Sequence, residues 1–340
     1  MSTKRTIRGL LDRSAVMAGI TQWCETRMHR GLTVLMYHRV LPDAEALRYP
    51  FRSLAMPESA FATQVRWLAE NCTVLPMREC VERLHDDVQP ARPLVAVTFD
   101  DGYLDNATIA APLLEEAGLR GTFFVTTGFL ATGEPLWFDR FALAYRALDS
   151  KALAAIVQAQ SSTDTTEFQT LADWMAFAKS RSAPERDALL LRLVHAAKVD
   201  ENDSSLAPMS LEQLRTLHAR GHEIGGHTVS HPLLPDCDDN TLASELVDSK
   251  QTLELWLDTR VSGLAYPNGN HDERVLAATQ RAGYDYACTT SPGINLKSTG
   301  PLQFARLDLT RDRVFDSKGE FNTLAFRSEV CRVRRFMRAG

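Results

Sequence analysis

The segment Leu94-Val95-Ala96-Val97-Thr98-Phe99-Asp100-Asp101-Gly102 joins a run of apolar and β-branched residues to two adjacent carboxylates. An apolar run without polar alternation is typical of a parallel strand that is covered on both faces. The two aspartates therefore stand where a buried strand ends, and α/β barrels place their active sites at the carboxyl ends of their strands. A polar turn that begins the next helix is the other interpretation of Asp-Asp-Gly.

Comparable apolar runs occur along most of the chain and alternate with helical patterns. The strands are predicted at 32–37, 94–99, 121–126, 222–226, 261–266, 284–289 and 304–309, and the helices at Pro57–Asn71, Ala107–Ala117, Ser210–Arg220, Asn240–Leu257 and Asp272–Ala282. Such alternation predicts an α/β protein wound around a parallel sheet, with a barrel as the leading architecture. The segment from about 139 to 208 breaks the alternation with roughly three helical stretches and a polar break at 161–166, so we expect a helical insertion there.

The charge distribution divides the chain into three parts. We expect a basic N-terminal helical segment at 1–30, a barrel at 31–320 that contains the insertion, and a basic C-terminal tail at 321–340. The basic termini are compatible with peripheral contact to an anionic membrane face, although a helix that packs on its own domain is the simpler reading of 1–30. The sequence does not indicate an oligomeric state.

The overall composition excludes several classes of protein. The chain has 38 Lys+Arg against 43 Asp+Glu and a net charge of −5, so it lacks the basic footprint of a nucleic-acid-binding protein. The 6 cysteines form no C-x-x-C pair, which argues against a disulfide framework or a thiolate zinc site. The first residues lack the uninterrupted apolar run of a signal peptide, and we therefore expect a cytoplasmic location.

A second polar cluster follows the predicted strand 222–226. His227-Thr228-Val229-Ser230-His231 places two imidazoles four residues apart, a spacing that lets both bind one ion if the segment coils. Two structural histidines are the alternative for this motif alone. Together with an aspartate at a neighbouring strand end, however, the pair gives three protein ligands with open positions, which is how catalytic zinc is held.

These two motifs resemble those of a known family. Thr98-Phe99-Asp100-Asp101-Gly102 and His227-Thr228-Val229-Ser230-His231 are similar to the first two motifs of the polysaccharide deacetylases, the NodB homology domain of carbohydrate esterase family four. The resemblance spans roughly 32–310 without the insertion. It implies a distorted (β/α) barrel that removes acetyl groups from N-acetylated sugars. It also implies that Asp100 is the general base and that Asp101, His227 and His231 bind a divalent cation. Zn²⁺ is the expected ion, since it suits histidine and carboxylate ligands.

The family's third motif is only partly present. Tyr266-Pro267-Asn268-Gly269 keeps the Pro-x-Gly turn, which in the family shapes the rim of the active site and offers a backbone N–H, here that of Asn268, to the oxyanion. A simple Pro-Gly turn is the alternative. The arginine that usually precedes this proline and orients the base is missing. Arg306, in the last predicted strand, could reach Asp100 instead, unless it is a solvated surface residue.

The general acid also departs from the family pattern. No histidine follows His271, so the late Leu-x-His motif is absent. His38 follows the strand 32–37 in Met36-Tyr37-His38, and members with such an early motif resemble rearranged versions that use this histidine; a structural histidine is the alternative. Tyr103, Tyr266, Pro267 and Asn268 are the predicted substrate-binding residues.

The sequence therefore predicts a metal-dependent hydrolase that removes acetyl groups from a GlcNAc-type polysaccharide, oligosaccharide or lipid-linked glycan, plausibly in exopolysaccharide synthesis. Metal-activated water would attack with Asp100 as the base. A noncatalytic glycan-binding relative and a hydrolase of a small cyclic amide or ureide remain as alternatives. The sequence does not name the sugar, or decide between N- and O-acetyl groups.

Overall fold

The computed structural model describes residues 31–86, 91–159, 168–198, 204–316 and 319–330. The predicted N-terminal helix and its membrane contact lie outside these residues, as does the polar break at 161–166. Among the residues described, no helix is both long enough and apolar enough to cross a membrane.

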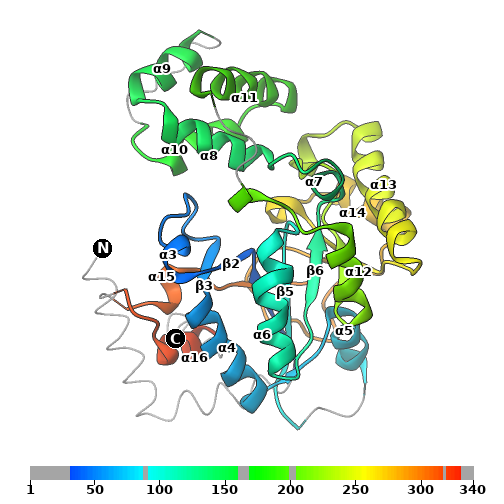
Figure 1. The fold of residues 1–340 in the computed structure, drawn as a ribbon. Helices are drawn as coiled ribbons and strands as arrows, with labels where there is room; N and C mark the ends of the chain where they lie inside the picture. The colour runs from blue at the N-terminus through cyan, green and yellow to red at the C-terminus, as the bar shows by residue number, and fades with distance from the viewer. Residues whose placement is uncertain (1–30, 87–90, 160–167, 199–203, 317–318, 331–340) are drawn as a thin grey trace, which may run out of the picture.

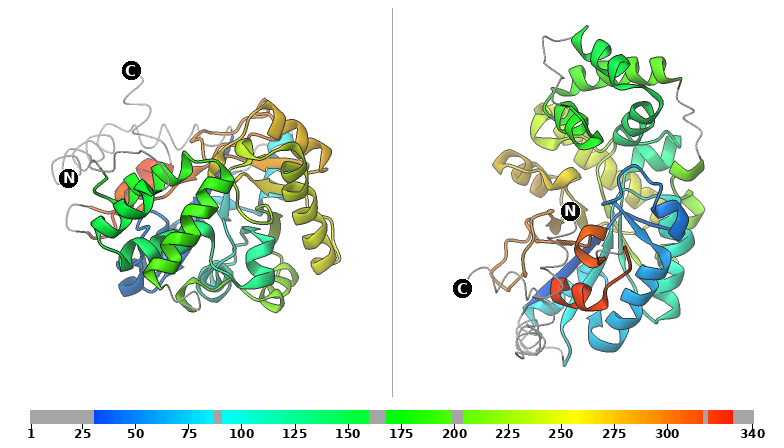
Figure 2. Two further views of the ribbon diagram at one scale, coloured as in Figure 1. Left: turned by 90° about the horizontal axis from the view of Figure 1, so that it is seen from above. Right: turned by 90° about the vertical axis from the view of Figure 1, so that its left-hand side faces the viewer.

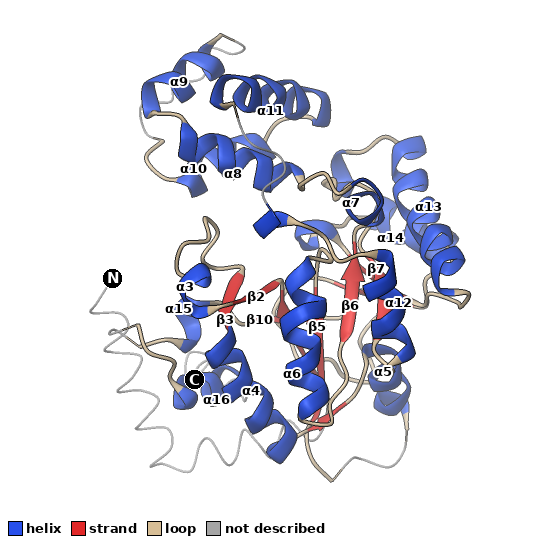
Figure 3. Cartoon of the chain, viewed as in Figure 1, coloured by secondary structure: helices blue, strands red, loops and turns tan. Residues whose placement is uncertain are grey.

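A curled parallel sheet forms the centre of the molecule (Figure 3). Its strands are β1 (Leu32–Tyr37), β4 (Thr73–Val74), β5 (Leu94–Phe99), β6 (Thr122–Val125), β7 (Glu223–Gly226), β8 (Gly263–Ala265), β9 (Tyr286–Cys288) and β10 (Leu307–Asp308). The order is β10-β1-β5-β6-β7-β8-β9, with β4 beside β5. The predicted distorted barrel is confirmed, and each of the seven predicted strands contains an observed one.

The longest pairing joins the second and third strands of this order. β1 and β5 pair over their full lengths, from Leu32 opposite Leu94 to Tyr37 opposite Phe99. Strands β9 and β10 form the two ends of the strand order, and a bridge between Cys288 and Phe304 connects the chain segments there. Because the strands are parallel, their carboxyl ends all open on one side of the sheet.

Helices cover the outside of the sheet (Figure 1). They are α4 (Glu58–Asn71), α5 (Met77–His85), a π-helical turn η1 (Asn106–Ala110) that continues into α6 (Ala111–Glu116), α12 (Leu211–Ala219), α13 (Asp239–Leu257) and α14 (Glu273–Arg281). Side-chain caps explain several of their starts: Ser210, Asp238 and Asp272 each accept a hydrogen bond from the first turn of the following helix. The five predicted helices are thus present within one or two residues.

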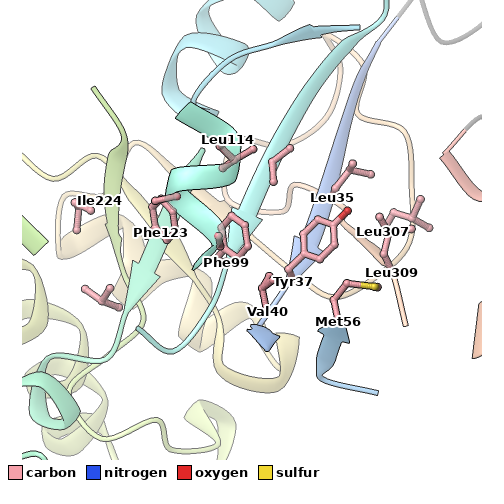
Figure 4. Packing of buried hydrophobic residues seen from close by; sticks show 14 of the residues in the cluster. Leu35, Tyr37, Val40, Met56, Phe99, Leu114, Phe123, Ile224, Leu307 and Leu309 are labelled. Carbon is pink, nitrogen blue, oxygen red and sulfur yellow. The ribbon is translucent and has the colours of Figure 1, made fainter. Parts of the chain in front are cut away.

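The core between the sheet and these helices is built from large apolar side chains (Figure 4). Phe99 of β5 lies between two neighbours, with its ring 4.8 Å from that of Phe123 and 5.6 Å from that of Tyr37. All three rings are buried. This packing holds β1, β5 and β6 in register and so fixes where their carboxyl ends, and the residues that follow them, lie.

The predicted insertion forms a separate helical layer. Roughly three helical stretches were expected, and its described residues form four α-helices, namely α8 (Trp137–Ala147), α9 (Ser150–Gln158), α10 (Leu171–Lys179) and α11 (Ala183–Ala197). It begins two residues before the predicted boundary and has its own apolar cluster around Phe141, Trp174 and Leu193. Figures 1 and 2 show that this layer lies beyond one end of the sheet, the end to which the β6 arrow points in Figure 3.

The predicted C-terminal tail needs correction. Residues Thr323–Val330 form helix α16, and Phe326 is fully buried with its ring 5.5 Å from that of Trp67 in α4. The sequence analysis separates 321–340 from the barrel as a basic tail, but apolar side chains at helical spacing pack Thr323–Val330 on the barrel. Only 331–340 lies outside the described residues.

Candidate metal and catalytic site

Three predicted metal ligands meet at the carboxyl ends of β5 and β7. Asp101, His227 and His231 are buried, and one ligand atom from each lies within 4.8 Å of the others. The Oδ1 atom of Asp101 is 3.5 Å from Nε2 of His227 and 3.6 Å from Nε2 of His231. Two ligands of one tetrahedral Zn²⁺, each about 2.0 to 2.2 Å from it, stand about 3.4 Å apart, so this spacing fits a shared ion.

The carboxylate oxygens of Asp101 also indicate a cation site. Both carboxylate oxygens of Asp101 are buried and accept no hydrogen bond from any residue that the structure describes. Burial opposes protonation of His227, but the carboxylates of Asp100 and Asp101 outweigh it and raise the pKa of His227. Burial, aided by the His227 charge, lowers the pKa of His231 to about 3, which keeps this imidazole in its neutral, ligating form.

The orientation of His227 is set by the adjacent strand. Its Nδ1 lies 2.7 Å from the carbonyl oxygen of Ala265 at the end of β8. A hydrogen donated from Nδ1 leaves the lone pair on Nε2, the atom that faces Asp101. This contact is the usual way in which a protein fixes the tautomer of a metal-binding histidine.

The loop that carries the two histidines has a strained backbone. Thr228 and His231 have positive φ angles of 68° and 57°, and Asp101 has a φ of 78°. Positive φ is costly for residues other than glycine, most of all for a β-branched threonine, and such strain concentrates at functional sites. The i, i+4 histidine pair therefore converges through this turn and not through a helix.

Glu245 of α13 holds this loop, and the sequence analysis did not identify it. Its carboxylate accepts hydrogen bonds from the backbone N–H groups of Val229 (2.7 Å) and Ser230 (2.9 Å) and from the hydroxyl of Ser230 (2.6 Å). Within the loop, the hydroxyl of Thr228 accepts a hydrogen bond from the backbone N–H of His231. Glu245 lies 14 residues after His231 within an ordinary helical pattern, so no local motif marks it.

Arg306 reaches Asp100, as the sequence analysis proposed for the missing arginine. Two guanidinium nitrogens lie 2.7 Å from the two Asp100 oxygens, and Nε donates to the carbonyl oxygen of Thr289. Arg306 is 0% exposed, which excludes the solvated alternative. Burial disfavours the Asp100 carboxylate, but Arg306 outweighs burial and holds the pKa of Asp100 well below its usual range. Asp100 is therefore ionised.

His38 lies at the end of β1 and lines the same cavity as Asp101 and His231. The side-chain amide of Asn106 donates to its carbonyl oxygen at 2.8 Å. Next to it, the buried pair of Arg39 and Asp105 fixes the chain, since Asp105 also accepts the N–H of Val40. These contacts hold the backbone of His38, and the residue is half-buried in the cavity lining.

Three of the predicted substrate-binding side chains are not available to a ligand. Tyr103 is 1% exposed and donates its hydroxyl to Asp139, and Tyr266 is 0% exposed with its ring stacked on His271. Pro267 is buried as well. A tyrosine or proline near the end of a strand can point into the core as readily as into a cleft. These three side chains are buried in the core. Asn268 alone of the four is exposed.

A cavity of about 490 Å³ connects these groups with the insertion. His38, Asp101, His231 and Asn268 line it from the barrel. Across from them lie side chains of α8 and α10. Phe138 of α8 places its ring 5.1 Å from that of His231, and the indole N–H of Trp137 donates to the His231 carbonyl oxygen. The volume lies in the range of small-molecule sites.

Comparison with known proteins agrees with this arrangement. The sequence model of the family described as polysaccharide deacetylase matches residues 87–163 and 192–287, which together make up half of the chain. The chain belongs to this family. The polysaccharide deacetylase match is interrupted only within the helical insertion. As a member, the protein is a hydrolase that acts on the amide bonds of acetylated sugars.

Individual relatives are distant. YxkH of Bacillus subtilis, which carries a polysaccharide deacetylase name, is 23% identical over 286 residues, or 84% of this chain and 74% of its own. The structure of the Streptococcus pyogenes deacetylase PplD in complex with acetate matches with a TM-score of 0.58 at 20% identity, over 85% of this chain and 96% of that chain. IcaB from Ammonifex degensii matches with a TM-score of 0.55 at 19% identity, over 83% and 93% of the two chains. These structures share the fold.

Proposed function

We propose that this deacetylase removes the N-acetyl group of a GlcNAc-type sugar with the help of a divalent cation held by Asp101, His227 and His231. The observation that carries the proposal is the buried carboxylate of Asp101, which has no hydrogen-bond partner among the described residues and faces two imidazoles. When bound, the cation supplies Lewis-acid chemistry to the amide carbonyl and to the attacking water. Zn²⁺ is the ion that best suits this ligand set.

Asp100 is the proposed general base. It is ionised, and its two oxygens retain lone pairs beyond those that accept from Arg306. The bidentate contact fixes the carboxylate plane next to the ligand Asp101, where it can accept the proton of the attacking water. Arg306 thereby acts as a positioning residue for the base, in the place of the arginine that the third motif lacks.

His38 is the proposed general acid, and Asn268 the proposed oxyanion donor. Both line the cavity that contains Asp101. A half-exposed imidazole can donate a proton to the leaving amine as the carbon–nitrogen bond breaks. The φ of Asn268 is 56°, a turn conformation that belongs to the Pro-Asn-Gly segment.

Acetate release tests this function. The substrates are N-acetylglucosamine oligomers and the methyl glycoside of N-acetylglucosamine, each assayed with Zn²⁺-loaded protein. We expect release by the wild type and a loss of at least about a hundredfold in Asp100→Asn, which keeps the shape of the carboxylate but does not accept the proton. Asp248→Asn, at an exposed position of α13, is the matched control and should retain full activity. Equal release by Asp100→Asn and wild type would remove Asp100 from the reaction.

A further inference from the structure

The insertion turns one face of helix α10 toward the catalytic cavity. Leu171, Ala172, Met175, Ala176 and Lys179 all line the cavity and follow the i, i+1, i+4, i+5, i+8 spacing of a single helix face. The first four are apolar, and the last is a lysine. This wall belongs to the segment that the family match skips.

Lys179 is the end of this face that contacts the third-motif turn of the barrel. Its Nζ donates to the side-chain oxygen of Asn268 at 2.6 Å, and Asn268 follows β8 in the turn that borders the metal ligands. Leu171 lies eight residues away, which is about 12 Å along a helix. The cavity lining therefore contains two of the three metal ligands, a cation bonded to the third-motif turn, and an apolar stripe that extends from this cation along α10.

The ammonium group of Lys179 has capacity for a further ligand. It can donate three hydrogen bonds, of which Asn268 takes one, and no carboxylate pairs with it among the described residues. Burial lowers the pKa of Lys179, so an anion beside it would be favourable. Apart from His38, Asp101 and His231, the ionisable side chains of the described cavity lining are Lys179 and Arg52, both cationic.

The aromatic side chains of the cavity are already engaged with protein. Phe138 packs edge-on against His231 and Phe51, and the guanidinium of Arg186 lies over the ring of Trp137. The accessible apolar part of α10 consists of Leu171, Ala172 and Ala176, since Met175 is buried in the core of the insertion. It suits a hydrocarbon better than a second sugar ring, whose hydroxyl groups would lose water without finding partners there.

We propose that the substrate is an N-acetylated sugar joined through a phosphate to a hydrocarbon chain, with the phosphate on Lys179 and the chain along the apolar face of α10. This inference rests on the proposed function, because it assigns the acetylated sugar to the metal ligands. Each of the three parts of such a molecule has a chemically matching group in the cavity lining, and Lys179 ends the apolar stripe. Lipid-linked sugar phosphates are the chemical class that carries all three.

Acetate release from four matched compounds tests the proposal. They are N-acetylglucosamine 1-(geranyl phosphate), N-acetylglucosamine 1-phosphate, geranyl N-acetylglucosaminide and methyl N-acetylglucosaminide. We expect kcat/KM to be at least about tenfold higher for the first than for the last, since burial of even two methylene groups supplies that factor. The two intermediate compounds should each show part of the gain.

Variants separate the two contributions. Lys179→Met should remove the gain that the phosphate brings, and Ala172→Glu, at an exposed position of the stripe, should remove the gain that the geranyl chain brings. Lys151→Met and Ala155→Glu make the same changes at exposed positions of α9, outside the cavity lining, and should leave all four kcat/KM values unchanged.

A binding measurement distinguishes failure of this inference from failure of the proposed function. Geranyl phosphate carries no acetyl group, and calorimetric titration should show that it binds the wild type more tightly than Lys179→Met or Ala172→Glu. Such binding without acetate release from any compound would overturn the proposed function and retain the subsite. Equal kcat/KM for the geranyl phosphate and methyl compounds, with no binding of geranyl phosphate, would overturn the subsite.

Discussion

At the scale of single residues, the pair formed by Asp100 and Arg306 shows how the chain replaces a missing part of its family's site. The third motif lacks the usual arginine, and Arg306, directly before β10, contacts both oxygens of Asp100. Both groups are buried, so each charge depends on the other. Arg306 could be proposed from the sequence because it lies in the last predicted strand, and the strands of a wound sheet come together in space. In the structure β10 neighbours β1, and β1 neighbours β5.

This dependence predicts strong coupling between the two residues. Arg306→Met leaves the Asp100 carboxylate buried without a partner and should lower the free energy of unfolding by about 3 to 5 kcal/mol at neutral pH. Asp100→Asn similarly leaves a buried guanidinium charge. In the double variant neither position carries a buried charge without its partner, so the loss should be clearly smaller than the sum of the two single losses. Urea unfolding of the four proteins gives this cycle, and additive losses would show that the contact does not stabilise the protein.

At the scale of secondary-structure elements, the strength of the sequence signal explains what could be predicted. Strands β1 and β5 were predicted to the residue because each is a six-residue apolar run. The two-stranded sheet of β2 (Arg39–Leu41) and β3 (Ala55–Pro57) was not predicted, since strands of three residues carry no periodicity. Glu245 and Lys179 were missed for another reason: each acts on a loop that is distant in sequence, and neither interrupts the pattern of its own helix.

The first turn of α8 contains a buried polar contact between the insertion and the barrel. Asp139 is buried and accepts hydrogen bonds from Tyr49 (2.8 Å) and from Tyr103, which follows the first motif. Burial raises the pKa of Asp139 from 3.8 to about 6, although the bonds from the two hydroxyl groups oppose this. The folded protein therefore binds more protons than the unfolded chain between about pH 4 and pH 6, and this carboxyl makes the fold less stable as pH rises through that window.

Asp139→Asn should remove this pH dependence. Relative to the wild type, the variant should gain about 2 to 3 kcal/mol in the free energy of unfolding between pH 4 and pH 7, because each pKa unit corresponds to about 1.4 kcal/mol. Urea unfolding across this range measures the difference. Asp187→Asn, at an exposed position of α11, serves as the control. Its free energy of unfolding should change with pH in the same way as that of the wild type. If the free energy of unfolding of Asp139→Asn also changed with pH as that of the wild type does, Asp139 would have an ordinary pKa in the folded state.

At the scale of the whole molecule, the site joins parts of the chain that are far apart in sequence. Asp101 follows β5, whereas His227 and His231 follow β7, and the sheet places β6 between these two strands. Glu245 of α13 and Ala265 of β8 fix the orientation of the histidine loop. An ion bound by the three ligands would therefore connect the β5 end to the outer layer of helices, and its binding energy would contribute to the stability of the fold.

Metal removal should accordingly lower the thermal stability of the entire protein. At Zn²⁺ one hundredfold above its dissociation constant, the folded state should gain about 2.7 kcal/mol, which raises Tm by several degrees. Chelation should reverse this gain in the wild type. Asp101→Asn should melt at the same temperature with and without Zn²⁺, because the amide removes the anionic ligand, while Asp248→Asn should respond as the wild type does. A wild-type Tm that is independent of Zn²⁺, in protein shown by elemental analysis to take up no ion, would mean that the three side chains do not form a metal site. The buried oxygens of Asp101 would then have to be satisfied by a group other than a metal ion.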